Sequence, residues 1–296
     1  MISSSLNQLA RQEKTRREIL HKSDLVPPLP DLVTRLLRLL HQQDTEPRDL
    51  ELLLQNDQVL VAKMLAMVNS PFYGLNRSVN TVKEAVMVLG FRGVRSLVLA
   101  TSTAKLLQRD FGCYGHEPKG LWLHAVCVAS GARSLAKRLG LPADDAEQLF
   151  VCGLLHDIGK LLLVNFVQGG VGLDPDQPAE VYERAMLGLD HAEAGAMVTQ
   201  KWNLSREIQD VIRAHHDEEQ GGGSDVPSLH AVIVRIADAV AHEVGAGYEP
   251  GRSPGHRISA ADLAAVGLQQ DHWVEIRDEL AANMDEAVAA LGHLGG

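Results

Sequence analysis

Apolar residues recur along this chain at the spacing of amphipathic helices. In the segment 29–40 they occupy positions 29, 32, 33, 36, 37 and 40, which lie on one face of a helix. No segment alternates between apolar and polar residues with the two-residue period of a strand, so the pattern predicts an all-α fold. The same spacing predicts further helices over 48–55, 57–69, 81–90, 93–107, 121–139, 144–167, 179–187, 190–203, 205–216 and 228–245, with two more near the carboxyl end.

Loops divide the helices into groups. The segment 110–120 contains three glycines and a proline, which is typical of a loop, and we place a boundary between two packed helical subdomains there. The expected organisation is a helical extension over 1–21, a first helical half over 22–118, a second helical bundle over 119–250 and a helical tail over 251–296.

Two predicted helix starts carry the pattern of a capping box, in which a residue at the cap is followed three positions later by a glutamate. These pairs are Thr81 with Glu84 and Asp190 with Glu193. Gly90 is expected to end the helix that Thr81 begins, because glycine is common directly after a helix.

Composition and charge narrow the class of protein. The chain of 296 residues has a net charge of -10 and only 4% aromatic residues, which argues against general nucleic-acid binding. The basic residues Lys14, Arg16 and Arg17 alternate with acidic ones, as on a solvated helix face. The three cysteines form no CxxC pair, and no apolar run approaches the roughly 18 residues of a membrane span. We therefore expect a cytoplasmic protein without a disulfide framework.

The segment HDIGK at 156–160 is the strongest candidate for chemistry. Its polar side chains interrupt an apolar run, with VCGLL before it and LLLV after it, and burying charge is costly unless it is paired or coordinated. Imidazole and carboxylate groups are ligands that divalent first-row metals accept, and the Lys160 ammonium could hold a phosphate beside a metal. The ordinary alternative is a helix that ends near Gly159 and leaves His156 and Asp157 on the surface.

Other histidines and one aspartate fall on separate predicted helices. Taken alone, His124 could be a hydrogen-bonded core residue and His191 an exposed residue of a first helical turn. His215, next to His216, lies near a helix end, where the macrodipole also favours histidine. Together with His156–Asp157 and Asp238, these residues supply five imidazoles and two carboxylates. That is the composition of a hydrolytic site with one or two metals, where a metal acidifies water and stabilises charge on a phosphoryl group.

Asp238 has its own alternatives. It lies in a predicted helix, VIVRIADAVAH, that has almost no polar face. Its ordinary partner would be Arg235, three positions earlier, or His242, four positions later, because both spacings bring helical side chains together.

The order H…HD…H…HH…D resembles the HD superfamily of metal-dependent phosphohydrolases, and HDIGK matches the form found in its HD-GYP branch. The earlier half resembles a more particular family, the HDOD domain, in the segments 25–40, 56–74 and 79–102. Within them, NSPFYG and TVKEAVMVLG are specific signatures. The resemblance covers about 25–220, with the HD-type part reaching Asp238. It implies an all-helical bacterial protein linked to signalling.

The chain departs from the family pattern in three respects. Gln58 follows Asp57 where proline is usual, and we expect only a local change at that helix start. The family commonly lacks some HD-type ligands, whereas this chain keeps all of them, which favours a metal centre. After His216 no GYP-type motif follows, which argues against efficient hydrolysis of cyclic-di-GMP.

The resemblance also implies a role for each site residue. One divalent transition metal would be held by His124, His156, Asp157 and Asp238, and a second by His191, His215 and His216, with Asp157 bridging. Lys160 would face the phosphate, so Asp157 and Lys160 are the candidate catalytic residues. Iron and manganese are the first candidates for one or two bound ions, although these ligand types accept several metals.

Two functions follow from these expectations. The first is a cytoplasmic bacterial signalling protein whose metal-binding HDOD domain acts through an unidentified signalling protein or a phosphorylated small molecule. The alternative is an active metal-dependent phosphohydrolase, either a phosphodiesterase or a nucleotide phosphatase. A scaffold without a working site is the third class, which the complete ligand set disfavours.

Overall fold

The computed structural model describes residues 2–22, 26–40, 42, 44–55, 57–167, 178–217, 228–252 and 258–292. Regular secondary structure within these ranges is helical, apart from an isolated bridge between His116 and Tyr248. The prediction of an all-α fold is therefore confirmed.

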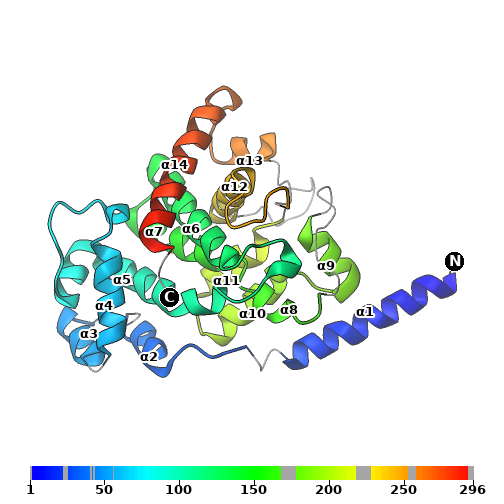
Figure 1. Ribbon diagram of the computed structural model, residues 1–296, viewed down its shortest axis with the longest axis horizontal. Coiled ribbons are helices and arrows are strands. Elements are labelled where there is room, and N and C mark those ends of the chain that lie inside the picture. Colours follow the sequence, from blue (N-terminus) through cyan, green and yellow to red (C-terminus); the bar gives the residue numbers. More distant parts are fainter. Residues whose placement is uncertain are drawn as a thin grey trace.

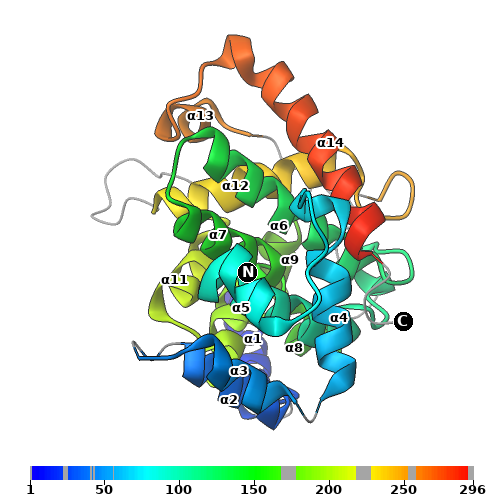
Figure 2. The same ribbon diagram turned by 90° about the vertical axis from the view of Figure 1, so that its left-hand side faces the viewer.

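The first half of the chain forms a group of helices around α5 (Figures 1 and 2). Its elements are α2 (Asp31–Leu40), α3 (Pro47–Leu54), α4 (Gln58–Val68), the 3-10 turn η2 (Pro71–Tyr73) and α5 (Val82–Leu107). Asp57 caps α4 by accepting a hydrogen bond from the Leu60 amide at 2.9 Å. The glutamine at position 58 thus leaves the helix start intact. Before this group, α1 (Ile2–Lys22) packs against α8 and α9, and its N-terminal end projects from the molecule (Figure 1).

α5 is bent at Gly90, as its sequence predicts. Gly90 has φ 68° and ψ 177°, a conformation outside the helical region that glycine adopts without a steric penalty. By length and composition alone α5 could cross a membrane, but 61% of its most apolar window is buried inside the fold. The prediction that no apolar stretch approaches that length thus overlooked α5, which packs here against α2, α3, α4 and α7.

The second half packs around α6, which contacts α7, α12 and α14 along its length. Its elements are α6 (Gly120–Arg138), α7 (Ala143–Leu155), α8 (Lys160–Leu163), α9 (Ala179–Leu187), α10 (His191–Lys201), α11 (Arg206–Ala214) and α12 (Leu229–Glu243). The chain then adds α13 (Ala260–Ala265), the 3-10 turn η4 (Gln270–His272) and α14 (Trp273–Leu291). α14 lies along α6 and also contacts η2, so the last helix links the two halves.

The prediction of one helix over 144–167 is wrong. α7 ends at Leu155, residues 156–159 form turns, and α8 starts at Lys160. Gly159 passes so close to α10 that an added Cβ would lie 2.0 Å from the His191 carbonyl oxygen and 2.5 Å from the Gly195 nitrogen. The residues on both sides of this break are apolar, so the sequence pattern does not reveal it. The close contact of Gly159 with α10 explains why the helix is interrupted here.

Buried apolar side chains form one continuous cluster that runs from Ile19 to Leu291. The loop after α5 is joined to the loop after α12, since the Glu249 amide donates to the Gly115 carbonyl at 2.9 Å. The division into four segments stays a prediction, because this core runs through all of them.

Candidate metal centre

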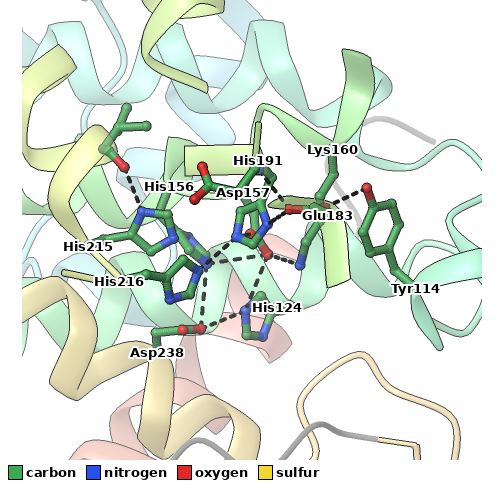
Figure 3. Close-up of polar contacts among 12 residues, drawn as sticks. Tyr114, His124, His156, Asp157, Lys160, Glu183, His191, His215, His216 and Asp238 are labelled. Atoms are coloured by element: carbon green, nitrogen blue, oxygen red, sulfur yellow. Dashed lines mark hydrogen bonds and ion pairs between the residues drawn. The ribbon is translucent and has the colours of Figure 1, made fainter. Parts of the chain in front are cut away.

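Five separate elements bring the predicted ligands to one point (Figure 3). His124 comes from α6, Asp238 from α12, and His191 from the first residue of α10. The turn after α7 and the end of α11 supply the two adjacent pairs, His156–Asp157 and His215–His216. Apart from His216, which is partly buried, these residues are at most 2% exposed. The alternative that HDIGK lies on the surface therefore fails.

Backbone contacts orient two of the imidazole rings. His156 Nδ1 lies 2.7 Å from the Gly153 carbonyl, and His215 Nδ1 lies 2.6 Å from the Ile212 carbonyl. Each contact holds one nitrogen of the ring, and the Nε2 atom of the same ring points into the cluster. Second-shell contacts of this kind fix the tautomer and orientation of metal-ligating histidines.

Three groups of possible ligand atoms occur here; two of them share no residue and form a first and a second set, and the third, His156 with Asp157 and His215, joins these sets. In the first set, His124 Nε2 is 2.9 Å and His156 Nε2 is 3.5 Å from Asp238 Oδ1. The second set comprises His191, His215 and His216. Within each set the ligand atoms lie within 4.8 Å of one another.

Asp157 lies between the two sets. Its Oδ2 atom is 3.4 Å from His156 Nε2 and 3.7 Å from His124 Nε2, whereas its Oδ1 atom is 3.1 Å from His191 Nε2. Each carboxylate oxygen thus faces a different set. This is the geometry that a bridging carboxylate needs.

The donor atoms fit a divalent metal. His124 Nε2, His156 Nε2, His215 Nε2 and Asp238 Oδ1 are buried without a hydrogen bond of acceptable geometry. Buried polar atoms are rarely left unsatisfied, and imidazole and carboxylate groups converging in this way are ordinary ligands of transition metals. A metal ion in the first set would satisfy the atoms of His124, His156 and Asp238, and one in the second set would satisfy His215 Nε2.

Burial and charge shift the pKa values of the site in opposite directions. Burial lowers the pKa of His215 to about 3, with further lowering from the nearby histidines. Burial also lowers the pKa of His124, only partly offset by Asp238. Burial opposes the charged form of His156 as well, but the carboxylates of Asp157 and Asp238 outweigh it and raise that pKa to about 10. The pKa values of neighbouring imidazoles thus shift in opposite directions, according to how close each ring lies to the carboxylates.

Lys160 lies against Asp157, with Nζ 2.6 Å from Oδ2 and only 4% of the residue exposed. The ammonium also lies 5.2 Å from the centre of the Tyr114 ring. Burial by itself would raise the pKa of Asp157, but Lys160 and the neighbouring histidines hold it well below its usual value. A role of Lys160 toward phosphate stays a prediction.

The sequence did not reveal Glu183, which is fully buried in α9. Its Oε2 atom accepts a hydrogen bond from the His191 amide at 2.7 Å and lies 2.7 Å from His191 Nδ1. Its Oε1 atom accepts a hydrogen bond from the Tyr114 hydroxyl at 2.8 Å. Glu183 therefore orients His191, and only the packing of α9 against the site places it there.

The two ordinary partners suggested for Asp238 behave differently. Arg235 is bound elsewhere, donating to Asp262 from Nε at 3.0 Å and to the Asp217 carbonyl from Nη1 at 2.7 Å. His242 does approach Asp238, with 3.4 Å between Nε2 and Oδ1. Asp238 thus carries histidines on two sides and no arginine.

The fold and this cluster define an all-helical protein with an HD-type arrangement of histidines and aspartates. The sequence profile of the HDOD domain matches residues 26–218. The chain therefore belongs to the HDOD domain family.

Two curated relatives share part of their length with this chain. An uncharacterised protein from Treponema pallidum (strain Nichols) is 30% identical over 212 residues, which are 69% of this chain and 40% of the relative. Ribonuclease Y from Fervidobacterium nodosum is 24% identical over 231 residues, which are 78% of this chain and 38% of that protein. The chain thus spans less than half the length of either relative.

Two solved structures share the whole fold. A proposed phosphohydrolase from Shewanella amazonensis SB2B has a TM-score of 0.69 and 26% identity, covering 94% of this chain and 98% of its own. An HDOD domain protein of unknown function from Geobacter sulfurreducens has a TM-score of 0.72 and 24% identity, covering 97% and 99%.

Proposed function

We propose that this protein is a cytoplasmic bacterial signalling protein whose HD-type centre binds one or two divalent transition metal ions. Its output is interaction with a signalling protein or a phosphorylated small molecule. Membership of the HDOD family supports the signalling role, and the complete set of histidines and aspartates supports the metal centre. Iron and manganese are the metals we expect first.

One observation carries the proposal. Asp157 turns its two carboxylate oxygens toward different sets of buried histidines, and several nitrogens of these histidines make no hydrogen bond of acceptable geometry. In a purely structural core this arrangement would lower the free energy of unfolding, because buried polar atoms without partners destabilise a fold. Metal binding would offset this destabilisation.

Metal content of the purified protein tests the proposal. Protein prepared without chelator should carry about one or two transition metal ions per chain. Asp157→Ala should lose most of this metal, since its carboxylate faces both ligand sets. Asp210→Ala, which removes an exposed carboxylate from α11, is the matched control and should retain the metal. Wild-type protein that stays metal-free after reconstitution with iron or manganese would refute the assignment.

The second candidate function is phosphohydrolysis, favoured by Lys160 beside the carboxylate and by similarity to the proposed phosphohydrolase from Shewanella amazonensis. When bound, divalent ions supply an acidified water and stabilise charge on phosphoryl oxygens. The chain itself would contribute Asp157, which orders the ligand sets, and Lys160, which would move from Asp157 to the phosphate.

Activity assays separate the two functions. We expect at most weak hydrolysis of bis-p-nitrophenyl phosphate and no efficient turnover of cyclic-di-GMP, because no GYP-type motif is present. Any activity should vanish in Asp157→Ala and fall in Lys160→Ala. Efficient turnover of a defined nucleotide by the metal-loaded protein would establish phosphohydrolysis as the function. Activity that survives Asp157→Ala would come from a contaminant or from another site.

A further inference from the structure

The signature NSPFYG contributes no residue to the metal centre, but it encloses a buried arginine. The rings of Phe72 and Tyr73 lie 5.1 and 4.8 Å from the guanidinium carbon of Arg133 on α6. The Phe72 ring also packs against Phe150 of α7, with 5.8 Å between centroids. The signature thus builds an aromatic wall around one cation at the junction of the two halves.

The hydrogen-bonding capacity of this cation is only partly used. Arg133 is 8% exposed, and its Nη2 atom pairs with Glu147 Oε1 at 2.7 Å. The Nε atom of Arg133 and the Oε2 atom of Glu147 are buried without partners. Nearby on α5, Arg95 is also buried and has two guanidinium nitrogens without partners. Two buried guanidinium groups thus lie near one buried glutamate, and of the two only Arg133 lines a neighbouring cavity.

A cavity of about 420 Å³ opens beside Arg133, between α6, α14 and η2. This volume falls in the range of small-molecule sites. Its polar lining includes Ser130, Ser134, Lys137 and Asn283. Among the residues that the structure describes, no carboxylate lies within ion-pair distance of Lys137, whereas its neighbour Arg138 pairs with Glu279.

The positive charge of Arg133, which also lines the cavity, repels the Lys137 ammonium. Lys137 is exposed at the rim of the cavity, but the burial of part of its side chain lowers its pKa, and the Arg133 guanidinium lowers it further. Two carboxylates also line the cavity: Glu279, which pairs with Arg138, and Glu286, which offsets part of the positive charge of Lys137 and Arg133. The negative end of the helix dipole also favours cations at the carboxyl end of α6, but it does not explain the buried Arg133 Nε atom without a partner one turn earlier.

We propose that this cavity binds a small ligand carrying an oxyanion, a phosphate or a carboxylate, through Lys137 and Arg133. The oxyanion would accept hydrogen bonds from both cations and relieve their repulsion, and it would accept another from the Ser134 hydroxyl, whose oxygen accepts from Asn283 Nδ2 at 2.8 Å. Hydrogen bonds between charged groups are the strong ones, so two cations suffice for a measurable affinity. The site is separate from the metal centre and does not depend on the proposed function.

Titration calorimetry of the purified protein with pyrophosphate and with glutarate tests this site. Binding of either anion with a Kd of about 1 mM or tighter is expected. Pyrophosphate alone would indicate a phosphate ligand, glutarate alone a carboxylate ligand, and both a general oxyanion site. Lys137→Ala should weaken binding about tenfold or more, and Lys137→Arg should keep most of it.

Two controls make the result specific to the cavity. Lys105→Ala removes an exposed cation from α5 and should bind as the wild type does. Lys137 and His124 are 13 positions apart on α6, about 20 Å along a helix, so Lys137→Ala should retain the metal. Absence of binding to either anion, or equal affinity in Lys137→Ala and wild type, would overturn the proposal.

Discussion

At the scale of single residues, Asp157 and Glu183 have different roles in the candidate metal centre. Asp157 reaches both ligand sets directly, whereas Glu183 holds the ring of His191 from behind through Nδ1. A carboxylate placed behind a ligating histidine fixes its orientation and raises its basicity. Removing Asp157 and removing Glu183 should therefore have different effects on metal binding.

Glu183→Gln should weaken metal binding without abolishing it. We expect the affinity for manganese to fall about 10- to 100-fold, the usual effect of losing such a partner. The measurement is a competition titration with a chelator of known affinity, with Glu275→Gln on the exposed face of α14 as control. Unchanged affinity would mean that Glu183 serves only the packing of α9.

At the scale of elements, the helix termini show both the local capping bonds that the sequence predicts and contacts with distant segments. Thr81 accepts the expected hydrogen bond from the Glu84 amide at 3.1 Å, and Asp190 accepts one from the Glu193 amide at 2.8 Å. The return bonds of both capping boxes differ from the pattern. Glu84 accepts from the amide of residue 80, and Glu193 instead receives Arg16 of α1.

Arg16 corrects the expectation that the basic residues of α1 form a solvated face. Its guanidinium donates to both carboxylate oxygens of Glu193 at 2.5 and 3.1 Å, and to the Gly188 carbonyl at 2.6 Å. Arg17 behaves as expected, pairing with Glu13 on its own exposed helix. α1 is thus attached to the turn between α9 and α10, directly beside the start of α10.

Arg16→Ala should release α1 from this turn. The loss in stability should be about 1 kcal/mol, because the pair is partly exposed, and the amides of α1 should exchange with deuterium faster. Arg17→Ala is the matched control, expected to change stability by less than about 0.5 kcal/mol. Equal exchange in the two variants would contradict the attachment.

The junction of α12 and α13 should give stability a pH dependence. Burial alone would raise the pKa of Asp262, but hydrogen bonds from Arg235 and Ser259 lower it below its usual value. A carboxyl with a lowered folded-state pKa stabilises the fold above its unfolded pKa of about 3.9, and this contribution is lost as the pH falls through the folded-state pKa.

Asp262→Asn should therefore destabilise the protein by about 1–3 kcal/mol at neutral pH. The difference from wild type should shrink as the pH falls below about 4, which urea unfolding at several pH values measures. Asp210→Asn, at an exposed pair on α11, should show little difference at any pH. A constant difference for Asp262→Asn would contradict the assigned ion pair.

At the scale of the whole molecule, the sequence predicted most of the helices and singled out the histidines and aspartates of the cluster, but not how they meet. Helical spacing and caps are local, so they are visible without a structure. His124 and Asp238 were also visible, because each interrupts an apolar helix. The break after Leu155, the contribution of Glu183 and the burial of Arg133 depend on contacts between distant segments. No local pattern carries that information.

A crystal structure of protein reconstituted with iron or manganese, with anomalous diffraction measured at the edge of that metal, tests the central claim most directly. The account predicts one or two anomalous peaks within bonding distance of His156 Nε2 and the Asp157 carboxylate. With two ions, each Asp157 oxygen should contact a different one, and the second should lie among His191, His215 and His216. Well-ordered metal-loaded crystals with no anomalous peak in this cluster would contradict the account.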